Sequence, residues 1–339
     1  MMTISTHSDA HNPAVTVVIP AYNAAHYISQ ALDSVQAQTF SDYEVIVVND
    51  GSSDREELER VLQSHPVRVI YLSQENKGVS AARNAAIRIA RGEFYAQLDA
   101  DDQWAPNYLE VQLGILKSNP DVTLVYPNAT IIGDSTETGL EFMKISPSAG
   151  EVSFESLVRQ QCVVMTSVTT RVSVIREAGL FDEELRSCED FDLWLRIAKG
   201  GGRIVYHRQP LVLYRRHAGS LSSDRVWMTR HLLAVFEKCA RMPVLTRTER
   251  NALDEQITLN RSMLHLFEGK RALSAGGAKA ALADFQRANQ YLRSTKLRVV
   301  IFLLRFVPRL VVRAFTVREF LWTQQPDNDL TGIDQPRIS

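Results

Sequence analysis

Short apolar runs and longer amphipathic runs alternate along the chain up to residue 126. The apolar runs are rich in β-branched residues, which is typical of strands covered on both faces of a sheet. They lie at residues 15–20, 44–50, 67–72, 93–99 and 122–126. Helix-length runs separate them, at residues 25–38, 54–64, 79–91 and 106–118, with Pro106 suited to a first helical turn. This alternation predicts an α/β fold in which helices flank a mainly parallel sheet.

The pattern becomes irregular after this region. Residues 128–165 lack periodicity and contain many Gly, Ser, Thr and Pro residues, so we expect an excursion or lid there. A strand at 167–171 and a helix at 172–178 follow. A helix at 189–199 ends at three glycines, and strands are expected at 203–206 and 211–214. We expect a flexible N-terminus over 1–14 and a first domain over 15–222.

The remainder of the chain reads as a helical extension over residues 223–325, before a flexible tail over 326–339. Residues 224–295 predict three or four amphipathic helices, with a helical hairpin around 276–292. Residues 297–318 form a basic, apolar segment, in which Pro308 is expected to kink the helix. One stripe of that helix holds Arg298, Arg305, Arg309 and Arg313. Such a helix suits the surface of an anionic bilayer, and the alternative is a core helix docked on the first domain.

Composition narrows the class of protein. Hydrophobic residues make up 45% of the 339 residues and charged residues 23%, as in soluble globular chains. The net charge of −1 provides no overall electrostatic attraction to nucleic acid. The three cysteines are far apart, which excludes a disulfide framework and favours a reducing compartment, hence a cytoplasmic location. No apolar run reaches the length of a membrane span, and residues 1–12 lack the apolar core of a signal peptide.

Polar residues follow three of the predicted strands, at residues 20–23, 49–52 and 99–102. Because ligands bind at the carboxyl ends of parallel strands, these residues predict a site. Asp99 and Asp101 are spaced to converge on one hard cation, for which their oxygen ligands favour Mg²⁺ or Mn²⁺. The alternative is an acidic loop that caps the helix starting at Pro106.

The second of these strand ends suggests base recognition. Asp50 is placed to accept a hydrogen bond from a ring N–H, such as that of a uracil imide. The alternative is a turn followed by a helix with Asp54 as its N-cap. Lys77, Gly78 and Arg83 add donors and cationic charge near the start of the next helix, where anions are favoured.

Six motifs in this order closely resemble family 2 glycosyltransferases of the GT-A fold, a Rossmann-like fold. The resemblance covers about residues 15–222. The motifs are VVIPAYNAAHYISQALDSVQAQTF, EVIVVNDGSSD, NKGVSAARNAAI, GEFYAQLDADDQW, CEDFDLWLRIAKGG and YRRHAGSLS.

The resemblance implies roles for individual residues. Asp101, with Asp99, is expected to bind the metal, and Asp190 to be the catalytic base of an inverting transfer. His217 is expected near the diphosphate, the alternative being an exposed loop histidine. The nucleotide-sugar site is expected to comprise Pro20, Ala21, Tyr22, Asp50, Lys77, Gly78, Arg83, Asp99, Ala100 and His217.

Two acceptor-site residues are expected from the spacing on the helix at 189–199. Trp194 lies one turn after Asp190 and would stack on the acceptor sugar, the alternative being core packing. Glu189 would orient the acceptor or cap the helix.

The function expected from this resemblance is metal-dependent transfer of a sugar from a nucleotide-diphosphate donor to a saccharide or lipid-linked saccharide. UDP is the expected carrier, although thymine offers the same imide. The expected setting is surface polysaccharide or glycolipid synthesis, with peripheral contact to the inner face of the plasma membrane. The alternatives are a non-catalytic nucleotide-binding module and a nucleotidyltransferase, whose Gly-rich phosphate loop is absent after the first strand. The oligomeric state is left open.

Overall fold

The computed structural model describes residues 12–217, 219–220 and 223–322, with side chains up to residue 315. Its contacts divide the chain into two units. The first comprises the described residues up to Gly133, Glu137–His217 and Thr246–Ala252. The second comprises Asp134–Thr136 and the described residues of Ala218–Leu245 and beyond Leu253. Most of the two predicted flexible ends, and the predicted boundary at residue 222, lie outside the described residues.

An eight-stranded sheet in the order β3-β2-β1-β4-β7-β6-β8-β5 forms the centre of the first unit, among the residues described. β3, β2, β1 and β4 are parallel, β7 runs antiparallel to both of its neighbours, and β6 pairs with β8 in parallel. The mainly parallel sheet is therefore confirmed. The strands are β1 (Val15–Ala21), β2 (Tyr43–Asp50), β3 (Ile70–Gln74), β4 (Phe94–Gln97), β5 (Gln103–Trp104), β6 (Val122–Gly133), β7 (Thr169–Arg171) and β8 (Arg203–Arg216).

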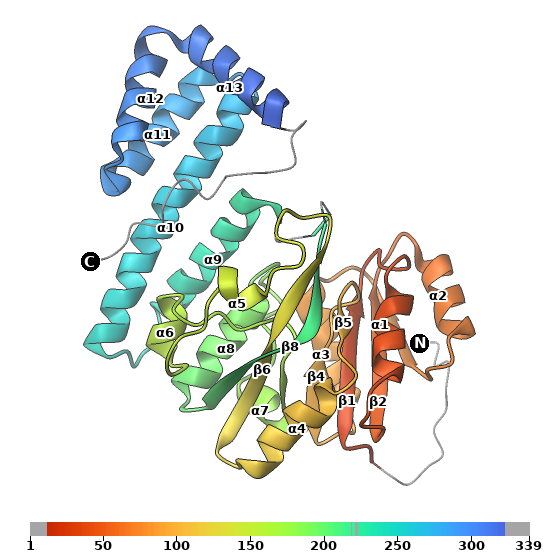
Figure 1. The fold of residues 1–339 in the computed structure, drawn as a ribbon. Helices are drawn as coiled ribbons and strands as arrows, with labels where there is room; N and C mark the ends of the chain where they lie inside the picture. Colours follow the sequence, from red (N-terminus) through yellow and green to blue (C-terminus); the bar gives the residue numbers. More distant parts are fainter. Residues whose placement is uncertain (1–11, 218, 221–222, 323–339) are drawn as a thin grey trace. The chain divides into compact units, whose positions relative to one another are not determined.

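Helices cover both faces of this sheet (Figure 1). One face carries α1 (Ile28–Gln36), α2 (Arg55–Ser64) and α4 (Tyr108–Ser118). The other carries α3 (Val79–Ile89), α7 (Val172–Glu177) and α8 (Glu189–Lys199). The central strands β1 and β2 are buried along nearly their whole length, which explains why their sequences show no polar alternation.

The structure corrects the prediction for two regions. β6 continues to Gly133, so the irregular excursion starts later than residue 128, and it contains the short helices α5 (Phe142–Ile145) and α6 (Phe154–Val158). The two strands expected at 203–206 and 211–214 are one strand, β8. Polar residues divide its apolar pattern, and the register with β6 shifts where Pro210 faces Asn128, because proline cannot donate to the ladder.

Two helix starts also differ from the expectation. α4 begins at Tyr108, and Pro106 lies before it, with its carbonyl accepting a bond from the Thr39 amide. Asp54 does precede α2, but its side chain does not cap that helix. It accepts instead from the amide of Ala25, which ties the loop after β1 to the loop after β2.

The second unit is helical. It contains α9 (Arg225–Cys239), most of α10 (Arg247–Ser274), α11 (Ala278–Leu292), α12 (Thr295–Phe306) and α13 (Pro308–Trp322). A small core joins α10, α11 and α12 through Leu266, Phe285 and Leu304, among others. Gly269 allows the close approach, because a Cβ there would lie 2.6 Å from the Phe285 ring. None of the helices described is long and apolar enough to cross a membrane.

Pro308 has a stronger effect than the expected kink. α12 ends at Phe306, and a new helix starts with Pro308 at its first position. A missing backbone N–H costs nothing at that position, because the first amides of a helix have no partner within it.

Candidate active site

The loops after β1 and β2 meet at the carboxyl edge of the sheet. Asn23 adopts a left-handed conformation with a φ of 51°, and its amide donates to the Ser52 hydroxyl over 3.0 Å. The Asn23 side chain in turn accepts from the Ser53 amide over 2.8 Å. Of the residues expected to lie along the nucleotide, Ala21 is buried in the strand, Pro20 is partly buried and Tyr22 is 55% exposed. This edge therefore presents a fixed backbone with an exposed aromatic ring.

Asp50 organises the next loop. Its carboxylate accepts from the amides of Lys77 and Gly78, each over 2.8 Å, and from the Gln74 side chain over 2.7 Å. A ring N–H of a nucleotide base, the expected partner of Asp50, would therefore meet a carboxylate that already accepts three hydrogen bonds from the protein. An ionised carboxylate has about four acceptor positions, which leaves Asp50 one for a further donor. The Lys77 side chain is exposed at the same place.

Arg83 lies inside the protein, which differs from the expected contact with a nucleotide. It is 3% exposed and donates to Asp99 over 2.8 Å and also to Glu189. Burial lowers the pKa of Arg83, but the negative charges of Asp99 and Glu189 outweigh it and raise the pKa overall. Arg83 is therefore a permanent cation that joins the end of β4 to the start of α8.

The acidic segment after β4 does not cap α4, because the N-cap residue of that helix is Asn107 and the Leu109 amide in its first turn donates to the Gln38 side chain over 3.0 Å. Asp102 is buried and accepts from the Arg215 amide over 2.7 Å, while its Oδ2 has no partner. Asp101 is more accessible, with its side chain 31% exposed. Burial and the nearby charge of Asp99 raise the pKa of Asp101, whereas its hydrogen bond to His217 lowers it. Ala100 between them is buried.

His217 lies directly at this segment. Its Nε2 is 3.2 Å from the Asp101 carboxylate, and its ring stacks on Tyr27 at 5.2 Å between centroids. The His217 side chain is 23% exposed, so it is partly buried against these partners and differs from the alternative of an exposed loop histidine. The structure brings Asp99, Asp101 and His217 to one edge, with Arg83 behind them.

Asp190 is the second residue of α8. The helix starts after Cys188, which has a left-handed φ of 58°, so the chain turns sharply into the helix. Burial and the neighbouring charge of Glu189 raise the pKa of Asp190 to about 7, although Arg83 opposes this rise. The negative charge of Asp99 also raises the pKa of Asp190, by less than burial and Glu189 do. A pKa near neutrality suits a general base.

The two expected acceptor residues have other roles in the structure. Trp194 is 1% exposed and meets Phe181 edge-on at 6.3 Å, so it belongs to the core and has no face for a sugar. A residue one turn from Asp190 points inward here because α8 buries that side of the helix. Glu189 is buried and paired with Arg83, which argues against a direct contact with the acceptor.

Arg186 and Tyr27 at this edge were not singled out from the sequence. Arg186 lies beside Gly78, where an added Cβ would be 3.1 Å from its Nη1. The Arg215 guanidinium donates to the Asp101 carbonyl over 2.8 Å and lies over the Tyr27 ring. Their positions depend on contacts between distant segments, which neither periodicity nor spacing reveals.

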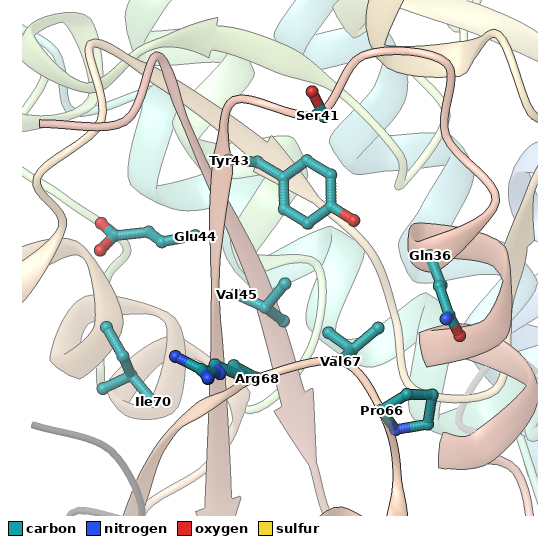
Figure 2. Close-up of a pocket in the computed structure, with 9 residues that line it drawn as sticks. All are labelled: Gln36, Ser41, Tyr43, Glu44, Val45, Pro66, Val67, Arg68 and Ile70. Atoms are coloured by element: carbon teal, nitrogen blue, oxygen red, sulfur yellow. The ribbon is translucent and has the colours of Figure 1, made fainter. Parts of the chain in front are cut away.

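A shallow pocket elsewhere in the first unit is distinct from this site. It has a volume of about 350 Å³, and its lining includes Tyr43, Glu44 and Ile70 (Figure 2). These residues start β2 and β3, so the pocket lies at the amino ends of the parallel strands. Glu44 is already bound to Arg91 and Thr16.

Three potential metal ligands also gather in the second unit, at His265, Glu268 and Asp284, with ligand atoms within 4.8 Å of one another. Arg230 pairs with Glu268 at 2.8 Å, and Arg287 lies 3.7 Å from Asp284. These arginines already balance the two carboxylates, which is the arrangement of an ion-pair network.

Comparison with known sequences defines the class of protein. The model of the family described as Glycosyl transferase family 2 matches residues 16–162. The chain is 32% identical over 186 residues to WfgD of Escherichia coli, covering 55% of this chain and 70% of that protein. WfgD is a UDP-Glc:α-D-GlcNAc-diphosphoundecaprenol β-1,3-glucosyltransferase. The chain therefore belongs to glycosyltransferase family 2.

Other relatives are longer than the matched region. An uncharacterised glycosyltransferase of Rickettsia felis is 34% identical over 193 residues, covering 55% of this chain. The match spans only 32% of that relative, about a third of its length.

Solved structures show the same fold. The structure of residues 1–349 of TarS from S. aureus with UDP-GlcNAc has a TM-score of 0.58 at 17% identity, covering 91% of each chain. The mannosyltransferase PcManGT from Pyrobaculum calidifontis with GDP-Man and Mn²⁺ has a TM-score of 0.59 at 21% identity, covering 93% of this chain and 89% of that one. The expected GT-A fold is confirmed.

The pKa of Asp190 predicts how activity depends on pH. As a general base, Asp190 would act in its carboxylate form, and kcat/KM would then fall about tenfold per pH unit below a pKa near 7 and level off above it. Glu189→Gln removes a charge that raises this pKa, so the falling limb should move to lower pH. Donor consumption measured between about pH 5 and 9 tests this. The same midpoint in both proteins would contradict the assignment.

Proposed function

We propose that this protein transfers a sugar from a nucleotide-diphosphate sugar to a hydroxyl group of a saccharide acceptor, with inversion at the anomeric carbon. The observation that supports this most strongly is the arrangement around Arg83. Through Asp99 and Glu189, this buried cation holds the acidic end of β4 beside the start of α8, where Asp190 has a pKa of about 7. A candidate base and candidate metal ligands thus share one edge of the sheet.

The proposed donor is a UDP-sugar. Support comes from the names of two similar proteins, since WfgD uses UDP-Glc and TarS is solved with UDP-GlcNAc. In this chain, the loop ordered by Asp50 would hold the base, and the exposed ring of Tyr22 would lie beside it. Lys77 and Arg186 would provide cationic charge for the phosphates.

The residues at the end of β4 fit a divalent cation. Asp101 is accessible, and its pKa is raised partly by repulsion from Asp99, a repulsion that a bound cation would relieve. Asp101 and Asp99 would hold Mn²⁺ or Mg²⁺, and His217 lies within reach of the same carboxylate. The PcManGT structure, with its Mn²⁺, supports this choice of ion. When bound, such an ion supplies positive charge opposite a departing diphosphate.

In the proposed reaction, Asp190 accepts the proton of the acceptor hydroxyl. The hydroxyl oxygen then bonds to the anomeric carbon from the face opposite the diphosphate, while the bond from that carbon to the phosphate oxygen breaks. A single displacement inverts the configuration and needs no covalent intermediate on the enzyme. Arg83 keeps Asp190 close enough to ionisation to act near neutral pH, because its charge lowers the pKa of Asp190.

The proposed acceptor is a saccharide or a lipid-linked saccharide used in surface polysaccharide or glycolipid synthesis. The name of WfgD, whose acceptor is a sugar on diphosphoundecaprenol, supports the lipid-linked form. We place the reaction in the cytoplasm, at the inner face of the plasma membrane.

A donor-consumption assay tests this function against its alternatives. With UDP-Glc or UDP-GlcNAc and Mn²⁺, release of UDP is expected, and NMR of the glycoside formed should show the anomeric configuration opposite to that of the donor. Retained configuration would contradict the inverting reaction. Pyrophosphate release from UTP and a sugar 1-phosphate would identify a nucleotidyltransferase. Binding of UDP without turnover of any nucleotide sugar, including GDP and dTDP sugars, would identify a binding module.

A further inference from the structure

Helix α12 has two apolar faces. The first is built from Leu297, Val300, Ile301 and Leu304, which pack into the core of the second unit. The second is built from Val299, Phe302, Leu303 and Phe306, whose side chains are 40% to 69% exposed. Both sets follow the i, i+3, i+4, i+7 spacing of a helical face. A helix at the surface of a soluble domain normally shows polar residues opposite its core, so this outer face requires another explanation.

Exposed apolar side chains continue past the end of α12. Val307 follows α12 and Leu310 lies in the first turn of α13, and within α12 the rings of Phe302 and Phe306 lie 4.8 Å apart. We call these residues the outer patch: Val299, Phe302, Leu303, Phe306, Val307 and Leu310. Six of the large hydrophobic side chains exposed among the described residues thus lie within twelve positions of the chain. Clustered exposure of this kind marks a contact surface, whereas scattered exposed residues do not.

Basic residues lie beside the outer patch along the same stretch of chain. The side chains of Arg298, Arg305, Arg309 and Arg313 are all exposed. The sequence contains no acidic residue between Asp284 and Glu319, so no carboxylate from this stretch offsets them. These side chains place positive charge beside the apolar patch. The surface that binds the patch should therefore be both apolar and anionic.

We propose that the outer patch binds the interface of an anionic phospholipid bilayer, with α12 and the start of α13 lying in the membrane plane. The aromatic and aliphatic side chains would enter the acyl boundary, and the arginines would contact lipid phosphates. A second copy of the chain fits less well, because a symmetric contact through the same patch would bring the arginines of both copies together. This inference does not depend on the transfer reaction.

Flotation of the full chain with lipid vesicles tests this proposal. The chain is expected to float with vesicles of phosphatidylglycerol and phosphatidylcholine, and to remain unbound with phosphatidylcholine alone. Binding should weaken as salt is raised. Phe302→Ser with Phe306→Ser, or glutamine at all four arginines, should each weaken binding at least about tenfold. The control for the aromatic variant is Val244→Ser, at a side chain 74% exposed in the same unit, and the control for loss of positive charge is Arg247→Gln with Arg250→Gln, at two exposed arginines of α10.

The variants should keep the helical circular dichroism of the parent, because the substituted side chains are exposed. A parent chain that does not float with anionic vesicles would overturn the proposal, as would variants that float as well as the parent. Dimers that dissociate in Phe302→Ser with Phe306→Ser, without lipid binding by the parent, would assign the outer patch to a second copy instead. Loss of flotation with unchanged donor consumption would support the membrane role while leaving the transfer reaction intact.

Discussion

Asp190→Asn is expected to lower kcat for sugar transfer by about 10²–10⁴-fold while leaving the affinity for the nucleotide unchanged. Asparagine keeps the size of the side chain but cannot take a proton from the acceptor. The carboxylate interacts with Glu189, Arg83 and Asp99 through its charge, and none of the contacts of Asp50 involves it. The measurement is steady-state transfer, paired with calorimetric titration of UDP.

The control for this variant is Glu184→Gln, which also removes an acid, from an exposed position shortly before α8. It should keep nearly full activity. Transfer retained by Asp190→Asn would remove Asp190 as the base. Joint loss of transfer and UDP affinity would show that the residue shapes the donor site instead.

Arg83→Gln is expected to lower the free energy of unfolding by about 3–5 kcal/mol, because it leaves one buried and one partly buried carboxylate without their cation. The carboxylates are those of Asp99, which follows β4, and Glu189, which starts α8, whereas Arg83 lies in α3. Urea denaturation followed by circular dichroism measures the loss. Activity should also fall, since the pKa of Asp190 would rise further without the opposing charge of Arg83.

Arg88→Gln is the matched control on the same helix. Arg88 is 58% exposed and pairs with Glu183, which is also exposed. Solvent screens this pair, so its loss should cost less than about 1 kcal/mol. Equal destabilisation by the two variants would contradict the structural role assigned to Arg83.

The central strands and helices were predictable because their sequences carry strong local signals. β1 and β2 are continuous apolar runs. The apolar residues of α8 recur with helical spacing up to the glycine that ends the helix. β8 was predicted as two strands because residues 207–210 are polar, and only its pairing with β6 shows that the strand continues. Pairing over such a distance has no local signature in the sequence.

The candidate site was likewise predictable only where local sequence signals exist. The edge that holds Asp50, Asp99 and Asp101 follows from strand ends in a parallel sheet, so its place could be predicted. The bond from Arg83 to Glu189 joins positions 106 residues apart, and no spacing rule predicts it. Trp194 was assigned to the site from helical geometry alone, which does not tell which side of α8 faces the core.

We propose that the carboxyl edge of the sheet binds a nucleoside diphosphate together with a metal ion. Calorimetric titration of UDP with Mn²⁺, without metal, and in Asp101→Ala tests this binding. Tight binding is expected with Mn²⁺, and much weaker binding both without the metal and in the variant. UDP binding that is equally tight with and without Mn²⁺, and unchanged in Asp101→Ala, would contradict it.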